Sequence, residues 1–524
     1  MTFRLSVVFV AVAAAAVLAA CGGGGSSSPP PAPPTATASP APAGTPTPIP
    51  LGSPSSAYYV SAISAANGVP AYISDPIVLT FSQQPDYSGA NTTEAAITVT
   101  PLTPSVPTPL ATGFITAASA PNEIGVKFYA QAGASYRISI GPTAKSASGT
   151  TYGGISQFIV TLPTTPPIPA PVQPQPGSVY FYGLNPGTLD SATQSWLSQL
   201  KPKIVRVGVY MGDTEPSSGT FSFTSLDTAL AQAKTLGIAV DLLLVQYNAP
   251  NWANGFGSSP TPLPAPRSGY IACTPSTFAS WAQAVVAHVT DPSQHSMYSY
   301  PAPAAIEIGN EPNTPNFWVV DSSNPACALH AFTSTKDPRP YLPYLQQAYT
   351  AAKSAVATGS PVFLNAGVAT NADDETYFAN LVGLASGSVD AWAVHLYAWS
   401  DPNSPLAAHD WEAFKVLTDD MSVAGPSKPF WVTEGAFTTN PYCYDGVDAQ
   451  TQAYFLVEDY NKMAALTEPS VASFLYFELE DQNAPAAPSG SEDPCFEPGG
   501  TGLVDSGGTA RPAFQAFANL AQGL

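Results

Sequence analysis

The larger, C-terminal part of the chain alternates between short apolar runs and longer runs with helical spacing. The apolar runs have the length of buried parallel strands. We predict strands over residues 179–184, 204–210, 239–245, 305–309, 362–365, 391–396, 430–433 and 473–477. Amphipathic helices are predicted over residues 191–199, 225–236, 276–288, 341–357, 374–385, 407–420, 449–465 and 512–521, with Gly237 and Gly359 as C-terminal caps.

This alternation of strand and helix predicts a (β/α)8 barrel, the TIM-barrel fold, over residues 178–524. A doubly wound open sheet is the alternative. That fold commonly carries a GxGxxG or GxxxxGK(S/T) motif at the start of a helix, and neither motif occurs here.

Residues 57–162 have a different pattern, in which several short runs alternate apolar and polar positions. The clearest runs cover residues 76–81, 96–100, 124–129, 136–140 and 158–161. About seven such strands in a hundred residues predict a β-sandwich. The runs PIVLTFSQ from Pro76 and YRISIGPTAKSASGTTYG from Tyr136 resemble bacterial Ig-like domains, which implies a spacer or weak adhesin without chemistry of its own.

Two segments rich in proline separate these parts. Residues 22–56 consist almost entirely of Gly, Ser, Pro, Ala and Thr and predict an extended spacer, and residues 163–177 predict a second linker. Because this second linker isolates the barrel, we expect residues 178–524 to fold alone.

The first 21 residues have a positive start at Arg4 and an apolar stretch from Val7 to Leu18, which predicts a secretory signal. The run Leu-Ala-Ala-Cys ending at Cys21 resembles a bacterial lipobox, which implies cleavage before Cys21 and lipidation of its thiol. Gly22 in place of Asp then favours the outer membrane of the cell envelope. The alternative is a plain signal peptide with an incidental cysteine.

Composition narrows the classes of binding partner and cofactor that the chain could have. With 16 Lys and Arg against 36 Asp and Glu the formal net charge is −20, which disfavours binding to nucleic acid. Four cysteines besides Cys21 predict two disulfides, for which three pairings are possible. Neither these cysteines nor the five histidines have metal-binding spacing, so we predict no metal and no cofactor.

The chemistry is predicted at the C-terminal ends of the barrel strands, where such barrels carry their active sites. Asn310-Glu311-Pro312 leaves the fourth strand, and Thr433-Glu434 closes the seventh. Two glutamates in these places can converge from opposite sides of the barrel mouth. Paired carboxylates are what glycosidic cleavage requires, because one donates a proton and the other attacks or activates water.

These motifs resemble the retaining glycoside hydrolases of clan A, and residues 309–318 (GNEPNTPNFW) are most similar to family 39, the β-xylosidase and exopolysaccharide-hydrolase type. The resemblance implies that Glu311 is the acid/base and Glu434 the nucleophile. It further implies that Asn310 binds the sugar 2-hydroxyl and that Arg206, His395 and Tyr397 surround the nucleophile. The sequence Gly-Ala-Phe-Thr-Thr after Glu434 departs from the usual family 39 continuation.

Further candidates line the strand exits. Trp252, Trp318 and Trp399 could stack on sugar faces or pack beneath loops. Glu478, Glu480 and Asp481 follow the eighth strand and could contact substrate hydroxyls or form a solvated loop. Arg206 could instead form a purely structural ion pair, and His395 could be a core histidine.

The predicted barrel also favours one disulfide pairing. Cys273 and Cys327 fall in loops after the neighbouring third and fourth strands, and Cys443 and Cys495 in loops after the seventh and eighth. The sequence as a whole predicts a lipid-anchored retaining glycoside hydrolase acting on an extracellular poly- or oligosaccharide. The alternative is a non-catalytic carbohydrate-binding or adhesive lipoprotein on a degenerate barrel.

Overall fold

A computed structural model describes most of the chain after residue 53. The described stretches are residues 54–65, 68–70, 72–87, 93–108, 111–117, 120–255, 270–293, 301–370, 374–397, 413–467, 469–484, 495 and 499–524. The predicted signal segment, Cys21, nearly all of the first spacer and Trp399 lie outside them. Among the described helices, none combines the length and apolar character needed to cross a membrane.

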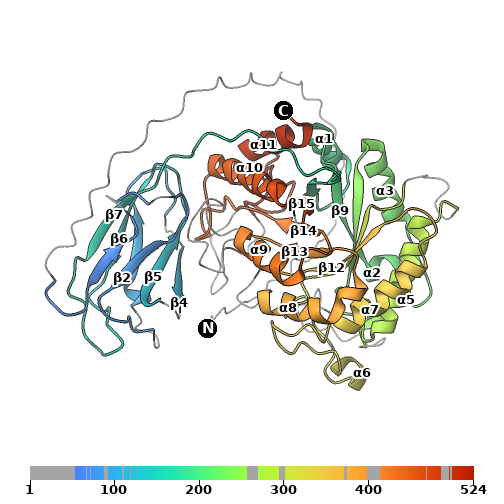
Figure 1. Ribbon diagram of the computed structural model, residues 1–524, viewed down its shortest axis with the longest axis horizontal. Coiled ribbons are helices and arrows are strands. Elements are labelled where there is room, and N and C mark those ends of the chain that lie inside the picture. Colours follow the sequence, from blue (N-terminus) through green and yellow to red (C-terminus); the bar gives the residue numbers. More distant parts are fainter. Residues whose placement is uncertain are drawn as a thin grey trace.

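The C-terminal part is a barrel of eight parallel strands (Figure 1). The strands are β8 (Tyr182–Asn185), β9 (Ile204–Tyr210), β10 (Ala239–Val245), β11 (Ala305–Asn310), β12 (Val362–Gly367), β13 (Trp392–His395), β14 (Phe430–Gly435) and β15 (Val471–Phe477). They pair in chain order, with β15 beside β8, and a parallel bridge between Val368 and Val394 joins the β12 and β13 edges. The predicted (β/α)8 architecture is confirmed, because an open doubly wound sheet would leave two free edges.

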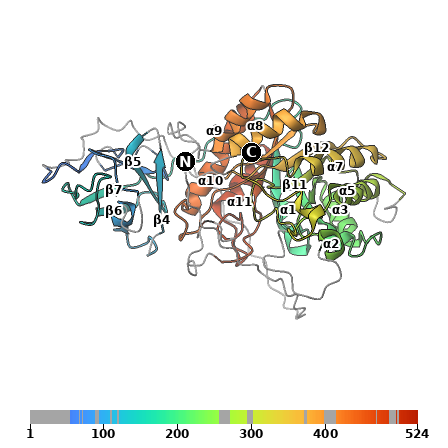
Figure 2. The same ribbon diagram turned by 90° about the horizontal axis from the view of Figure 1, so that it is seen from below.

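Helices cover the outside of the barrel (Figures 1 and 2). They are α1 (Ser191–Leu200), α3 (Thr224–Leu236), α5 (Pro275–Thr290), α7 (Leu342–Ser354), α8 (Asp374–Ala385), α9 (Ala413–Ala424), α10 (Ala449–Ala465) and α11 (Pro512–Gln522). Three one-turn helices lie in the loops: α2 (Met211–Thr214), α4 (Asn251–Asn254) and α6 (Pro325–Ala328). The eight long helices match the predicted ones to within a few residues where they are described, and residues 407–412 of the predicted sixth helix lie outside the described residues.

One predicted helix cap is confirmed and the other is wrong. Gly237 ends α3 in the left-handed conformation, with φ of 69°. Helix α7 instead ends at Ser354, before the predicted Gly359 cap. The reason is a tertiary contact: the backbone N–H of Ala357 donates to the Thr290 hydroxyl at the end of α5 (3.0 Å), which draws the chain away from the helix axis.

The barrel interior changes from apolar to polar along its axis. A cluster of buried side chains fills its lower part: Ile204, Ala305, Leu364, Ala391, Ala393, Trp431 and Leu475. Two residues further along three of these strands lie Arg206, Glu307 and Thr433, all buried. Side chains two residues apart share one face of a strand, so an apolar floor supports a polar layer directly above it.

The N-terminal part contains seven strands in two antiparallel sheets. One sheet has the order β1 (Val60–Ile63), β2 (Ile77–Phe81), β5 (Ala120–Phe128), β4 (Thr112–Ala117), and the other has the order β3 (Ile97–Pro101), β6 (Ser135–Ile140), β7 (Gln157–Thr161). The rings of Phe128 and Tyr136 meet with centroids 4.6 Å apart, which joins the two sheets in one core. The predicted all-β character is confirmed, and the Ig-like resemblance stays a prediction.

The second Pro-rich segment does not isolate the barrel, because it lies along α10 (Figure 1). The hydroxyls of Thr165 and Thr451 are 2.9 Å apart. Asn461 accepts a hydrogen bond from the backbone N–H of Val172 (2.7 Å). The expectation of a barrel separated by a free linker therefore does not hold: alternating prolines keep the segment extended, and α10 supplies side chains that satisfy its backbone.

The β-domain also contacts the barrel directly, at the loop between β14 and α10. Ala130 pairs with Val447 in a parallel bridge. The backbone N–H of Ala132 donates to Asp448 (2.7 Å). Lys127, only 3% exposed, forms an ion pair with Asp445. Both views place β4 on the side of the β-domain that faces the barrel (Figures 1 and 2).

Both favoured disulfides are present. Cys273 is bonded to Cys327 and Cys443 to Cys495. Each bond joins the loops that follow two adjacent barrel strands, as the predicted order of the strands in the barrel indicated. The second bond holds the same β14–α10 loop that the β-domain contacts from its other side.

We predict that Lys127→Met lowers the unfolding temperature of the full chain. Asp445 would lose this cation inside the interface, and removal of one partner from a buried ion pair costs about 3–5 kcal/mol. Lys145→Met is the matched control, since Lys145 is exposed on the same domain. Differential scanning calorimetry of both variants checks this, and equal unfolding temperatures would contradict the observed interface.

Candidate active site

One buried guanidinium contacts most of the polar layer. Arg206 is 6% exposed and points into the barrel from β9. Its Nε donates to Glu307 (2.6 Å), its Nη2 donates to the side-chain oxygen of Asn310 (2.9 Å), and its Nη1 donates to Glu434. The sequence required a buried partner for Arg206, and the structure provides two carboxylates. The planar fork of arginine suits this task because each nitrogen faces a different acceptor.

Glu307 is a site residue that the sequence analysis missed. It is fully buried in β11 and accepts further hydrogen bonds from the Gly367 backbone N–H (2.8 Å) and the Thr433 hydroxyl (3.1 Å). A charged residue in the middle of an apolar strand was the available signal, because such a charge needs a buried partner. Glu307 holds the guanidinium in place beneath Glu434.

Glu434, the predicted nucleophile, leaves β14 among three groups that favour its ionised form. Arg206 and His395 lie beside it, and the Tyr397 hydroxyl donates to its Oε2 (2.5 Å). Burial alone would raise its pKa, but the charges of His395 and Arg206 and the hydrogen bond from Tyr397 outweigh this and lower the pKa. Apart from burial, the charge of His395 has the largest effect on this pKa, followed by that of Arg206.

Glu311, the predicted acid/base, is held by its backbone. Its φ of 43° lies in the left-handed region, which is strained for a glutamate and persists where surrounding contacts hold it. The Glu311 N–H donates to the Gly367 carbonyl (3.0 Å). On the preceding residue, Gln246 binds both the N–H and the carbonyl of Asn310, each at 2.6 Å. Gln246 was also missed by the sequence analysis, because a glutamine at a strand exit has no distinctive spacing.

His395 links the two glutamates. Its Nδ1 lies 2.8 Å from Glu311 and 3.6 Å from Glu434. Burial would lower the His395 pKa, but the two carboxylates raise it. The imidazole is therefore held toward its charged form, between the two carboxylates.

The two glutamates lie close together and stay accessible. One donor atom each from Glu311, His395 and Glu434 lie within 4.8 Å of one another. The Glu311 and Glu434 side chains are 14% and 10% exposed, so a bound molecule can reach both. These three donors could also surround a cation, although Arg206 and His395 already supply positive charge to Glu434. In the other such group among the described residues, Cys443, Asp445 and Cys495, the sulfurs are joined in a disulfide.

The predicted stacking tryptophans differ in their placement. Trp318 is 2% exposed, its indole N–H donates to the His330 carbonyl (2.8 Å), and it packs edge-on against Tyr341 and Tyr344. Its ring has no open face, so the stacking role is wrong and the packing alternative holds. Trp252 is half-buried and donates to the Glu215 carbonyl (3.0 Å), and its role stays a prediction.

The acidic residues after β15 do not form a solvated loop. Asp481 is buried, accepts from the Gly502 N–H (2.7 Å) and pairs with Arg511, so its role is structural. Glu480 is half-buried. Glu478 is 2% exposed, and its Oε1 has no hydrogen-bond partner.

Aromatic residues that the sequence analysis missed lie at or after the ends of β9, β10 and β11. The rings of Tyr247 and Phe317 are stacked with centroids 4.9 Å apart, and Tyr210 meets Tyr247 at 6.1 Å. Each follows or ends a strand from β9 to β11. Tyrosine and phenylalanine at such positions are common enough in barrel loops that their spacing alone carried no signal.

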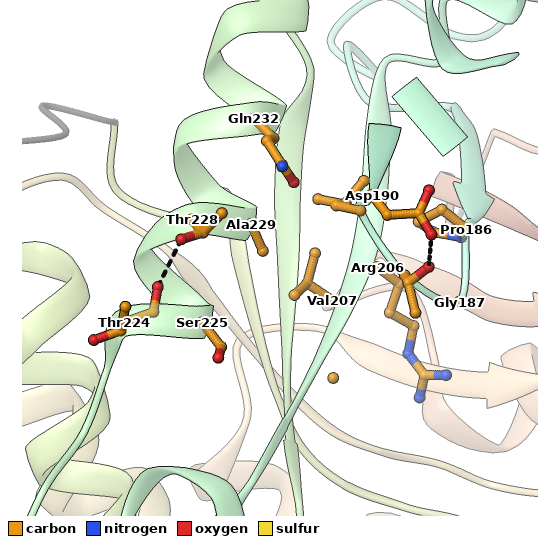
Figure 3. Close-up of a pocket in the computed structure, with 13 residues that line it drawn as sticks. Pro186, Gly187, Asp190, Arg206, Val207, Thr224, Ser225, Thr228, Ala229 and Gln232 are labelled. Atoms are coloured by element: carbon orange, nitrogen blue, oxygen red, sulfur yellow. Dashed lines mark hydrogen bonds between the residues drawn. The ribbon is translucent and has the colours of Figure 1, made fainter. Parts of the chain in front are cut away.

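A separate groove of about 410 Å³ lies outside the barrel wall (Figure 3). It runs between the loop before α1, the strand β9 and the helix α3, and its lining includes Asp190, Val207, Thr228 and Gln232. Neither Glu311 nor Glu434 lines it, although Arg206 is among its lining residues.

Comparisons with known proteins find similar chains among solved structures alone. No protein-family model and no curated protein matches the chain. Among solved structures it is similar to a family 39 glycoside hydrolase from Bacteroides cellulosilyticus WH2, with 15% identity over 77% of this chain and 73% of that chain and a TM-score of 0.43. It is also similar to a GH5_18 protein from Bifidobacterium longum subsp. infantis (15% identity, 66% and 79% covered, TM-score 0.46) and to xylanase 10B from Thermotoga maritima (14%, 66% and 96%, 0.43).

These structural neighbours are glycoside hydrolases of clan A, the group that the sequence motifs resemble. At these identities and TM-scores the likeness carries no argument about the chemistry or the fold of this chain. The argument for chemistry therefore rests on the carboxylate cluster itself.

The buried Glu478 generates a prediction about stability. Burial, opposed by a hydrogen bond from Gln482 and reinforced by Asp481 and Glu434, raises the pKa of Glu478 from the ordinary glutamate value of about 4.5 to about 8. Between these two values the folded state keeps the proton and the unfolded state loses it, so stability falls as the pH rises through this range. Glu478→Gln should remove this loss.

Calorimetric unfolding temperatures at pH 5 and pH 9 check the effect. The wild type should lose more stability over this range than Glu478→Gln, while the neighbouring Glu480→Gln should behave like the wild type. An identical pH dependence in all three proteins would show that Glu478 is not a buried neutral acid.

Proposed function

We propose that this protein is a retaining glycoside hydrolase that cleaves O-glycosidic bonds in a poly- or oligosaccharide. One observation carries the proposal: Glu311 and Glu434 leave β11 and β14 with donor oxygens no more than 4.8 Å apart. Carboxyl groups about 5–5.5 Å apart are typical of retention, whereas inversion needs about 6.5–9.5 Å to admit a water.

In the first step, Glu434 attacks the anomeric carbon. The carbon–oxygen bond to the leaving group breaks, a bond to the Glu434 carboxylate forms, and Glu311 gives its proton to the departing oxygen. The contacts with Arg206 and Tyr397 keep Glu434 ionised for this attack. Charge at one carboxylate and a proton at the other is the division that double displacement requires.

In the second step, water replaces the sugar on Glu434. Glu311 now takes a proton from the water, and the oxygen of that water forms the new bond to the anomeric carbon. Two inversions at one carbon leave its configuration unchanged. Asn310 presents its amide nitrogen for the sugar 2-hydroxyl, because its oxygen already accepts from Arg206.

The rival function, a carbohydrate-binding or adhesive protein on a degenerate barrel, fits the site less well. A binding protein has no need of two carboxylates held with opposite demands on protonation. The contacts of Arg206, Tyr397, His395 and Gln246 all serve to hold those carboxylates.

The first substrates to test come from the structural neighbours. These include an exo-β-1,4-mannosidase from Opitutaceae bacterium strain TAV5, a GH5_18 protein in complex with Manb1-4GlcNAc, and the xylanase already mentioned. For this chain we propose export and lipid anchoring through Cys21, with an Ig-like β-domain that packs on the catalytic barrel.

We expect Glu434→Gln to abolish turnover and Glu311→Ala to lose about 10²–10⁴-fold on substrates whose leaving group needs a proton. Activated aryl glycosides should stay substrates of Glu311→Ala. NMR of the first product should show a retained anomeric configuration. The exposed Glu375→Gln on α8 is the matched control and should keep full activity. An inverted product would contradict double displacement, and full activity in Glu434→Gln would contradict the site.

The anchor has its own test. If Cys21 carries lipid, Cys21→Ser should move the exported protein from membrane pellets to the soluble fraction, because the spacer would no longer be tethered. Fractionation followed by immunoblotting measures this. Unchanged pelleting of the variant would contradict the anchor without affecting the proposed chemistry.

A further inference from the structure

The charged residues of the barrel loops are distributed unevenly between its two ends. The eight connections that lead from a strand to the next long helix form the mouth, where Glu311 and Glu434 lie. Counting only the residues that the structure describes, these connections contain 12 Asp and Glu against 3 Lys and Arg. The seven connections at the opposite end, from a helix to the next strand, contain 2 against 3. Among these described residues, the excess of negative charge therefore lies at the mouth.

The arginines that the structure describes at this mouth already have acidic partners. Arg206 directs each of its three nitrogens to a side chain of the polar layer. Arg339 is paired with Asp337 at 2.7 Å, and Arg511 is paired with Asp481. A carboxylate or sulfate group on a saccharide would have to displace one of these partners in order to bind a guanidinium. The described part of the mouth therefore disfavours an anionic sugar.

A carboxyl oxygen within electrostatic range of Glu434 lacks a hydrogen-bond donor. Glu478 follows β15, the barrel neighbour of the strand that carries Glu434, and is 2% exposed. Its Oε1 accepts no hydrogen bond. The charges with the largest effect on this carboxyl are those of Asp481, Glu434 and Glu480, all of them acidic. An acceptor among acidic neighbours is complementary to a positively charged group with several donors.

An ammonium group fits both observations. It has three N–H donors and no acceptor, so it can satisfy a carboxyl oxygen and balance its charge. A mouth lined by one sign of charge also raises the local concentration of oppositely charged molecules, and this effect falls as the ionic strength rises. Neutral sugars gain nothing from such a field, and uronic acids or sulfated sugars are repelled by it.

We propose that the saccharide bound at this mouth carries free amino groups and is an oligomer or polymer of amino sugars without acetylation. This inference rests on the proposed function and names its substrate class. The field of the mouth acts on every ammonium group of the saccharide. The open oxygen of Glu478 accepts from the ammonium group that lies beside Glu434.

The test uses three tetrasaccharides that share a β-1,4-linked backbone and differ in charge. Tetraglucosamine is cationic, tetra-N-acetylglucosamine is neutral and tetraglucuronic acid is anionic. Isothermal titration calorimetry at about pH 5.5 measures their Kd values on the full chain carrying Glu434→Gln, in which no ligand is turned over. At low salt, tetraglucosamine should bind about tenfold more tightly than the neutral tetramer, and the anionic tetramer should bind more weakly than both. A salt concentration of about 0.5 M should remove most of this preference and leave the neutral Kd unchanged.

Two variants in the same background locate the effect. Asp213→Asn combined with Glu480→Gln removes two negative charges from the mouth, since Asp213 is exposed within electrostatic range of Tyr210 and Glu480 lies within range of Glu478. The Kd of tetraglucosamine at low salt should rise about fivefold, and that of the neutral tetramer should change by less than about twofold. Asp291→Asn is the matched control, because it removes a negative charge from the opposite end of the barrel and should leave both Kd values unchanged.

The outcomes separate the ligand class from the chemistry. Equal affinity for the cationic and neutral tetramers, tighter binding of the anionic one, or binding of none would overturn the amino-sugar inference. An equal loss of preference in Asp291→Asn and in the mouth variant would also overturn it. Wild-type turnover of activated aryl glycosides tests the proposed function separately. A preference for tetraglucosamine without any turnover would uphold the ligand class and contradict the hydrolase.

Discussion

The contact between Arg206 and its acceptors determines the geometry of the whole site. A guanidinium in a protein interior is costly unless each of its charges and donors is matched. Here Glu307 accepts from below, Glu434 from above and Asn310 from the side. These three residues come from β11 and β14, so one side chain from β9 aligns strands on different parts of the barrel wall.

The charge around Arg206 is balanced by protonation as well as by pairing. Asp241 lies opposite Arg206 in the β9–β10 register and is fully buried. Burial and the charge of Glu307 raise its pKa well above the ordinary value, which favours its neutral form. His395 is moved in the cationic direction by Glu434 and Glu311. The polar layer thus keeps Glu434 ionised without an excess of buried negative charge.

The loop that follows Glu434 is held from two sides. The Cys443–Cys495 disulfide ties it to the loop after β15, and the β-domain contacts it through Ala130, Ala132 and Lys127. The β-domain is therefore part of the structure that surrounds the barrel mouth. This differs from the role of a spacer, one of the two roles that the resemblance to Ig-like domains implied.

Local patterns in the sequence were sufficient to predict much of the fold and part of the candidate site. Hydrophobic periodicity predicted the eight barrel strands, and their order in a closed barrel predicted both disulfides and the meeting of Glu311 with Glu434. Such features depend on spacing along the chain and on one rule of barrel topology. Only the tertiary structure decided that Trp318 is buried against Tyr341 and Tyr344. It also decided that Glu307 and Gln246 support the carboxylates. The packing of the Pro-rich segment on α10 likewise appears only in the tertiary structure. These outcomes depend on contacts between residues far apart in the chain, and a side chain's environment in such contacts leaves no periodic trace in the sequence.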